Sequence, residues 1–261
     1  MKIAEKWTVS RIRDMKGRGR IACLTAYDFY TAQLLDEAGF PMILVGDSLG
    51  MTVLGYETTL PVTMEDMLRH TAAVVRGTRR ALVVADMPFL SYQISVEEAI
   101  RHAGRLLKEA GADAVKIEGG LARAETIRRL IENGIPVLGH IGLLPQSVRA
   151  MGGYRTQGRT PEAAEQLRRD AQAVENAGCF AVVLECVTPT LAEEITRTVG
   201  IPTIGIGSGP RCDGQVLVVN DLLGLTSRPP GFARPYAQLR PIIADAFRRF
   251  RQDVETGAFP E

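Results

Sequence analysis

Four acidic residues each close a short apolar run, and their carboxylates are the groups in this sequence best suited to chemistry. The runs cover residues 42–48, 81–86, 114–118 and 181–185, and they carry Asp47, Asp86, Glu118 and Glu185 at their ends. Continuous apolar runs that stop at a turn are typical of strands buried on both faces of a parallel sheet. Such strands would place all four carboxylates at one end of the sheet. Because the negative charges repel one another and burial removes their hydration, a cluster of this kind needs a cation or a shared proton to stabilise it. The pattern therefore predicts a metal-dependent active site.

Asp47 and Asp86 are the predicted metal ligands, because they end consecutive strands and could converge on one rim. Hard divalent cations prefer oxygen ligands, and Mg²⁺ often takes only one or two carboxylates beside waters and substrate oxygens. Either aspartate alone would be better interpreted as a helix N-cap or a salt-bridge partner. Their joint occurrence at strand ends favours the metal site.

Lys116 and Glu118 stand two residues apart on one predicted strand, so both side chains point to the same face. Beside a metal, Lys116 could neutralise a substrate carboxylate while Glu118 holds a metal-bound water. A buried ion pair that stabilises the fold is the structural alternative. Lys116 could also act as a Schiff-base nucleophile in metal-independent aldol chemistry.

Glu185 is the predicted proton acceptor, because its strongly apolar strand offers it few partners and burial would make it a stronger base. A structural glutamate is the alternative. His140 closes a fifth apolar run, 136–140, on the same predicted rim, where it could bond substrate. His70 and His102 fall in helical stretches and are interpreted as surface or packing residues.

The elements that must position these residues alternate regularly along the chain. Glycine-ended triplets at 37–39, 109–111, 132–134 and 176–178 each precede an apolar run, which is typical of a helix end, a tight turn and a strand. Helix starts are predicted at Thr63, Ser95 and Thr160, where a hydroxyl precedes an acid or a proline. The further runs at 21–24, 136–140, 202–206 and 215–219 bring the predicted strands to eight.

Eight strands alternating with helices predict a (β/α)₈ barrel, in which functional residues lie at the carboxyl ends of the strands. A doubly wound open sheet is the alternative. Residues 1–261 are expected to form a single domain with a short N-terminal helical lead-in and a last helix within 242–250. The long connection 142–160 could be a binding loop, or equally a surface excursion or an oligomer contact. The glycine-rich stretch 205–209 lacks the Lys-Ser/Thr of a phosphate-binding P-loop and could simply let the backbone approach a ligand.

Composition excludes several other classes of protein. With 31 basic and 30 acidic residues among 261, the formal charge of +1 gives no global field for nucleic acid or membrane binding. No stretch has the apolar length of a membrane span, and the N-terminus lacks the apolar core of a secretion signal. The four cysteines have no metal-like or redox-like spacing, so we expect reduced thiols in a cytoplasmic protein.

Seven motifs, in order along nearly the whole chain, resemble the 3-methyl-2-oxobutanoate (ketopantoate) hydroxymethyltransferase family. They lie at residues 45–51, 60–63, 85–89, 115–120, 139–143, 184–187 and 212–215. The resemblance implies a barrel of the phosphoenolpyruvate/pyruvate superfamily type. It implies transfer of a one-carbon unit from 5,10-methylenetetrahydrofolate to 3-methyl-2-oxobutanoate, giving 2-dehydropantoate in pantothenate and coenzyme A biosynthesis. It also implies one Mg²⁺ per subunit and a cytoplasmic homo-oligomer, typically a decamer.

By position, the resemblance implies a role for each matched side chain. Glu185 matches the proton acceptor, and Mg²⁺ would be held by Asp47 and Asp86, with Glu118 acting through water. The residues implied to bind or lie near the ketoacid are Asp47, Ser48, Asp86, Lys116 and His140. In the implied reaction, chelation of the 2-oxo acid by Mg²⁺ stabilises the enolate formed when the C3 proton leaves.

One residue departs from the resemblance, and two other functions remain open. Leu144 stands in the long loop where threonine is expected in many members, which affects local loop contacts. The first alternative is another metal-dependent 2-oxo acid aldolase or lyase of the same superfamily, working without folate. The second, of a different class, is a non-catalytic ligand-binding barrel. Tyr154 in the long loop is a candidate folate contact.

Overall fold

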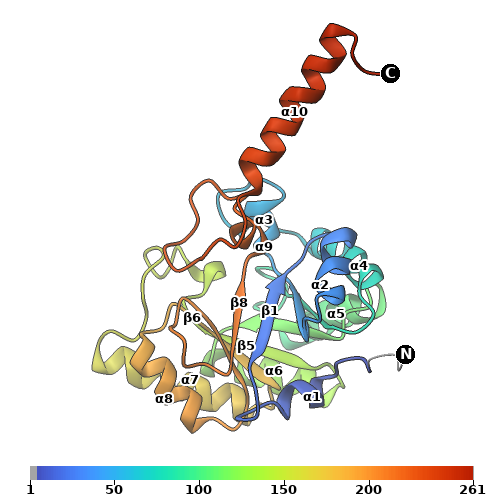
Figure 1. The fold of residues 1–261 in the computed structure, drawn as a ribbon. Coiled ribbons are helices and arrows are strands. Elements are labelled where there is room, and N and C mark those ends of the chain that lie inside the picture. The colour runs from blue at the N-terminus through green and yellow to red at the C-terminus, as the bar shows by residue number, and fades with distance from the viewer. Residues whose placement is uncertain (1–4, 261) are drawn as a thin grey trace. The chain divides into compact units, whose positions relative to one another are not determined.

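The computed structural model describes residues 5–260, so the first residues of the predicted N-terminal lead-in lie outside the described range. The chain divides into two compact units, residues 1–216 and residues 217–261. The first unit alternates strands and helices almost without interruption (Figure 1). No helix among the described residues is long and apolar enough to cross a membrane.

The strands are short, and their bounds are close to the predicted runs. They are β1 (Ile21–Thr25), β2 (Met42–Val45), β3 (Leu82–Asp86), β4 (Ala114–Glu118), β5 (Val137–Gly142), β6 (Ala181–Glu185), β7 (Thr203–Ile206) and β8 (Gly214–Leu217). All pair in parallel in sequence order and close into a barrel. The predicted (β/α)₈ barrel is confirmed, and the doubly wound alternative is wrong.

Helices follow each of the strands β1 to β6, as a parallel barrel requires. In the first unit the α-helices are α1 (Val9–Arg13), α2 (Phe29–Glu37), α3 (Leu49–Thr52), α4 (Met64–Gly77), α5 (Val96–Lys108), α6 (Ala124–Glu132), α7 (Pro161–Asn176) and α8 (Pro189–Thr198). Two 3₁₀ turns accompany them, η1 (Leu121–Arg123) and η2 (Pro145–Ser147).

The helix ends confirm the local signals in the sequence. Thr63 and Asp66 form a reciprocal capping box at the start of α4, and the Ser95 and Thr160 side chains cap α5 and α7. The four predicted helix-terminating glycines all have positive φ, from +79° to +100°: Gly39, Gly111, Gly134 and Gly178. Glycine adopts this left-handed conformation without steric cost, which is why each helix stops there.

The barrel interior is filled by alternate residues of the strands. Apolar side chains from every strand form one buried cluster, for example Met42 and Leu44 of β2 and Leu82 and Val84 of β3. Successive side chains of a strand point to opposite faces, so residues two apart share the interior. The same alternation continues toward the carboxyl end of each strand and determines which later side chains also point inward.

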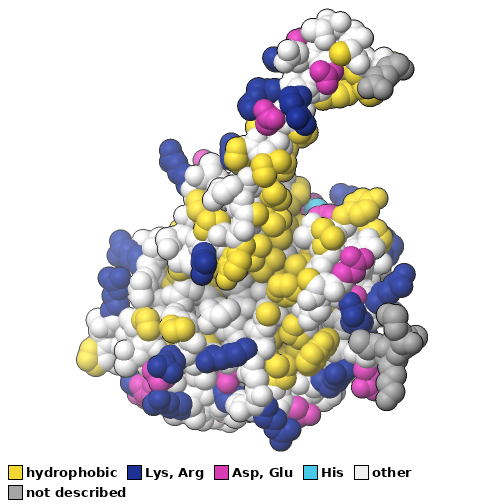
Figure 2. All heavy atoms as spheres, viewed as in Figure 1, with side chains coloured by type: hydrophobic (Ala, Val, Ile, Leu, Met, Phe, Trp, Pro, Cys, Tyr) yellow, Lys and Arg dark blue, Asp and Glu magenta, His cyan; other side chains and the backbone are white. Residues whose placement is uncertain are grey.

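The second unit contains the short helix α9 (Val219–Leu222) and the 18-residue α10 (Leu239–Thr256). The predicted C-terminal helix, 242–250, lies within α10. No residue of α10 is buried, and its exposed apolar side chains include Ile242, Phe247 and Phe250 at 62%, 71% and 57% exposure. Figure 2 shows apolar side chains on the surface of this helix among charged ones.

Candidate active site

Polar side chains replace apolar ones at the carboxyl end of the barrel interior. Asp86 continues the interior series of β3, and Lys116 and Glu118 continue that of β4. His140 and Glu185 do the same on β5 and β6. The strand register sets Asp86 beside Lys116, and Glu118 beside His140. The barrel therefore brings these predicted site residues together, as their positions at strand ends require.

Asp47 and Asp86 meet at the rim, as their positions at the ends of consecutive strands predicted. Asp47 follows β2 in the turn that leads into α3, and its backbone N–H donates to Asp86 Oδ2 over 3.0 Å. Both side chains are buried. Burial and the neighbouring Asp86 carboxylate raise the pKa of Asp47 to about 7. This pair therefore carries an unfavourable concentration of negative charge.

Lys116 is the cation among these acids. Its Nζ lies 3.0 Å from Asp86 Oδ1, 4.0 Å from Glu118 Oε1 and 3.3 Å from His140 Nδ1. Burial alone would lower the pKa of Lys116, but the surrounding carboxylates outweigh it and raise the pKa. A Schiff-base nucleophile needs a neutral amine, so this environment disfavours that alternative for Lys116.

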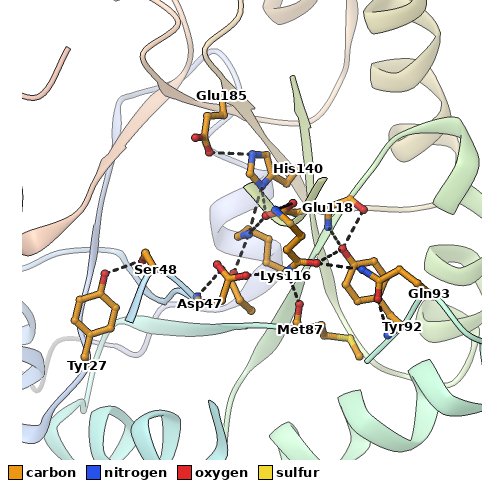
Figure 3. Close-up of polar contacts among 12 residues, drawn as sticks. Tyr27, Asp47, Ser48, Met87, Tyr92, Gln93, Lys116, Glu118, His140 and Glu185 are labelled. Atoms are coloured by element: carbon orange, nitrogen blue, oxygen red, sulfur yellow. Dashed lines mark hydrogen bonds and ion pairs between the residues drawn. The ribbon is translucent and has the colours of Figure 1, made fainter. Parts of the chain in front are cut away.

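His140 connects the lysine to Glu185 (Figure 3). Because an ammonium group can only donate, His140 Nδ1 faces Lys116 as an acceptor, which places the ring proton on Nε2. That atom lies 3.2 Å from Glu185 Oε2. Burial, together with the Lys116 charge, lowers the pKa of His140 and keeps the ring neutral. His140 is thus set to direct a donor at the predicted base.

The surroundings of Glu185 differ from the expectation of an isolated, apolar pocket. Its side chain is 16% exposed and has the buried His140 imidazole as a neighbour. The sequence pattern missed this contact because the partner comes from the adjacent strand rather than from nearby residues. After Glu185 the chain turns at Cys186, which has a φ of +50°, an uncommon conformation for a residue with a side chain.

Ser48 is held by a residue that the sequence analysis did not single out. The Tyr27 hydroxyl and Ser48 Oγ lie 2.8 Å apart, and Tyr27 is buried just after β1.

The two helical histidines bond to backbone carbonyls outside the acid cluster. His70 Nδ1 lies 2.6 Å from the carbonyl oxygen of Tyr27, and His102 Nδ1 lies 2.7 Å from that of Ser91. Both helical histidines are therefore packing residues, as expected.

The residues present fit a hard divalent cation that takes only a few ligands from the protein. Asp86 Oδ1 and Glu118 Oε1 are buried and accept no hydrogen bond, although both lie within ion-pair distance of Lys116. Burial, with Asp47 and Asp86 nearby, also raises the pKa of Glu118 well above its usual range despite Lys116. Among residues 5–260 no three His, Cys, Asp or Glu side chains are arranged to enclose a metal. A site with two aspartates and waters is the kind that Mg²⁺ accepts.

The model of one family, described as ketopantoate hydroxymethyltransferase, matches residues 6–261. The chain belongs to this family. A relative from Syntrophus aciditrophicus (strain SB), named 3-methyl-2-oxobutanoate hydroxymethyltransferase, is 57% identical over 258 residues, which cover 98% of this chain and 95% of the relative. The resemblance inferred from the seven motifs is confirmed.

Solved structures confirm the predicted fold type for this member of the ketopantoate hydroxymethyltransferase family. Phosphoenolpyruvate phosphomutase from Streptomyces platensis subsp. rosaceus has a TM-score of 0.64 at 16% identity, covering 96% of this chain and 88% of that one. A phosphonopyruvate hydrolase solved with oxalate and Mg²⁺ has a TM-score of 0.60 at 14% identity, covering 94% and 98%. At these identities the likeness concerns the fold.

The long loop 142–160 of this family member reaches into the acid cluster at its first turn. Gln146, on η2, is 4% exposed and bonds to Asp47 and to Tyr92. At its other end the loop is tied to the end of β6, because the Gln157 N–H donates to Cys186 O over 2.7 Å. The beginning of this loop is therefore part of the site. Gln146 and Tyr92 were not predicted as site residues, because apolar periodicity gives no signal for them.

Proposed function

We propose that this chain catalyses hydroxymethyl transfer from 5,10-methylenetetrahydrofolate to 3-methyl-2-oxobutanoate, giving 2-dehydropantoate and tetrahydrofolate, in pantothenate biosynthesis. The observation that carries the proposal is the buried line of contacts from Asp86 through Lys116 and His140 to Glu185. It sets a cation between a pair of acids at one end and a partly exposed carboxylate at the other. That is the arrangement needed to bind an anionic 2-oxo acid and remove a proton from it.

Asp47 and Asp86 would hold one Mg²⁺ per subunit, with Glu118 accepting a hydrogen bond from a water beside it. Bound there, Mg²⁺ supplies Lewis-acid polarisation of the oxo group of the ketoacid. Glu118 Oε1 supports this assignment, because it is buried, accepts no hydrogen bond and lies 4.0 Å from the Lys116 ammonium, whereas polar atoms at such depth ordinarily have closer partners.

The remaining residues bind the ketoacid and move its proton. Lys116 and Ser48 bind the substrate anion, the first through charge and the second through a hydroxyl oriented by Tyr27. Glu185 takes the C3 proton, and the resulting carbanion attacks the methylene carbon carried by the folate. Over the whole reaction both bonds from that carbon to the folate nitrogens break, the nitrogens take up protons, and one water molecule supplies the hydroxyl oxygen of the product. The neutral Nε2–H of His140 lies 3.2 Å from Glu185 Oε2 and would orient this base beside the ketoacid.

The co-substrate, the assembly and the compartment complete the proposal. Methylenetetrahydrofolate would approach from the open carboxyl end of the barrel, where Tyr154 is half-exposed. Partial burial, together with the negative charges of Glu185 and Asp47, raises the pKa of Tyr154.

We propose a cytoplasmic homo-oligomer, a decamer, without membrane or nucleic-acid partners. The exposed apolar side chains of α10 support self-association, and sedimentation velocity measures it.

One assay tests the function. Turnover of 3-methyl-2-oxobutanoate with methylenetetrahydrofolate should be abolished by chelator and restored by added Mg²⁺. Activity with free formaldehyde or another aldehyde, and none with the folate, would instead indicate an aldolase of the same superfamily. An absence of turnover with any of these donors would favour a non-catalytic barrel.

A further inference from the structure

The Gln146 side chain is buried and is hydrogen-bonded both to the acid cluster and to residues that follow β3. Its side-chain Nε2 donates to Asp47 Oδ2 and to the Met87 carbonyl, each over 2.9 Å. Its Oε1 accepts from the Tyr92 hydroxyl at 2.7 Å and from Gln93 Nε2 at 3.1 Å. Both amide protons and both lone pairs are therefore used, which fixes the side chain completely.

The orientation of this amide follows from its partners. A carboxylate and a backbone carbonyl can only accept, so the NH₂ group must face Asp47 and Met87 and the oxygen must face Tyr92. The Tyr92 hydroxyl is itself fixed at 3.2 Å from the backbone nitrogen and oxygen of Glu118. The amide is thus locked between β3, β4 and the loop after β5.

The backbone of the same residue holds a second acid. The Gln146 N–H donates to Glu118 Oε2 over 3.1 Å. One residue therefore holds one oxygen of Asp47 and one of Glu118, two carboxylates that lie at the ends of β2 and β4. Glu118 Oε1 receives no hydrogen bond.

We propose that Gln146 is a positioning residue for metal binding: it holds Asp47 and Glu118 so that their remaining oxygens face the divalent cation. This rests on the proposed function, in which those acids serve Mg²⁺. Outer residues that orient metal ligands typically change metal affinity by about 10- to 100-fold when removed. The chemistry of proton removal at Glu185 does not pass through Gln146.

The test measures metal binding without turnover. Mn²⁺, which has a paramagnetic signal, is titrated into the metal-free full chain, and free Mn²⁺ is followed by electron paramagnetic resonance. Gln146→Met keeps the unbranched shape and loses both donors to Asp47 and Met87; we expect its Kd for Mn²⁺ to rise by about 10- to 100-fold. Gln33→Met, at an exposed glutamine on α2 that bonds only to Glu37 among the described residues, is the matched control and should keep the wild-type Kd.

A second variant keeps the test decisive if Gln146→Met does not fold. Tyr92→Phe removes the hydroxyl that bonds to Gln146 Oε1 and should raise the Kd by about 3-fold, the loss of one modest hydrogen bond. Circular dichroism in chelator confirms the fold of each variant. Raising the Mg²⁺ concentration should restore much of the activity of Gln146→Met, which a general packing defect would not allow.

Two outcomes separate this inference from the proposed function. A wild-type chain that binds no Mn²⁺ overturns both. Wild-type binding with an unchanged Kd in folded Gln146→Met and Tyr92→Phe overturns only the role of Gln146 and leaves the metal-dependent function standing.

Discussion

Glu185 and His140 form the contact on which the proposed chemistry depends most directly. The carboxylate is the only one of the four strand-end acids with substantial exposure, and the neutral imidazole beside it can donate but carries no charge. Glu185 in these surroundings remains accessible to substrate, while the contact with His140 restricts the orientation of its carboxylate. The other three acids are enclosed and suit a static role around a cation.

Glu185→Gln should separate binding from proton removal. The amide is close in shape but cannot accept the C3 proton, so exchange of that proton with solvent should fall by at least about 100-fold. Mg²⁺ and ketoacid binding, measured by calorimetry, should remain close to wild type. Glu193→Gln, at a partly exposed residue of α8 that pairs with Arg197, is the control. Rapid C3 exchange in Glu185→Gln would eliminate the assignment.

The thiol next to this base should be unreactive at neutral pH. Burial and the adjacent Glu185 raise the pKa of Cys186 to about 11. The thiolate therefore forms only at a pH well above that at which an ordinary cysteine thiol ionises. At pH 8 iodoacetamide should therefore alkylate Cys186 about 10-fold more slowly in the folded chain than in the urea-unfolded chain, after allowing for the higher intrinsic reactivity of a more basic thiolate. Peptide mapping by mass spectrometry measures both rates. Equal rates in the two states would contradict the shift.

Strand β5 ends against strand β6 so closely that only glycine fits. Gly142 has a φ of +97°, and a Cβ at this position would collide with the backbone of Glu185 and touch Val187. The carboxyl ends of these two strands are therefore packed tightly together beside the candidate active site. The position of Glu185 depends on that packing as well as on its own strand.

Gly142→Ala and Gly134→Ala form a matched pair that isolates this close approach. Gly134 also has positive φ, +79°, but its missing Cβ would meet nothing within 4 Å. We expect Gly134→Ala to cost about 1 kcal/mol of unfolding free energy and to retain activity. Gly142→Ala adds steric overlap, so it should cost more and reduce kcat. Urea unfolding and steady-state kinetics measure both effects, and equal costs would show that the packing at Gly142 is not restrictive.

The barrel was predictable from the sequence because its signals are local. Apolar runs, hydroxyl caps such as Thr63 and terminating glycines each lie within a few residues of the element that they define. Strand β8 was expected at 215–219 but ends at Leu217, because Val219 already begins α9 and valine carries no helix-start signal. Gln146 was not predictable, since its partner Tyr92 lies 54 residues away and only closure of the barrel brings them together.

Metal binding should contribute to the stability of the whole barrel. A ligand that binds only the folded chain at 100 times its Kd adds about 2.7 kcal/mol to the free energy of unfolding. Thermal unfolding should therefore occur at higher temperature in Mg²⁺ than in chelator. Asp47→Asn and Asp86→Asn should lose that difference, whereas Asp14→Asn, at the end of α1, should keep it. A Tm that does not respond to Mg²⁺ in the wild-type chain would argue against the site.

The two anchored ends of the long loop have a consequence for the integrity of the chain. Gln146 is fixed among the acids, and Gln157 is bonded to Cys186 and Thr188. Arg149 and Arg155 lie between these anchors and are exposed. A trypsin cut at either arginine would produce two fragments that stay associated, each carrying one anchor. Such a nicked protein should run as two bands in a denaturing gel yet elute as one species and keep its turnover. That result would show that the two attachment points, rather than the covalent continuity of the loop, maintain the site.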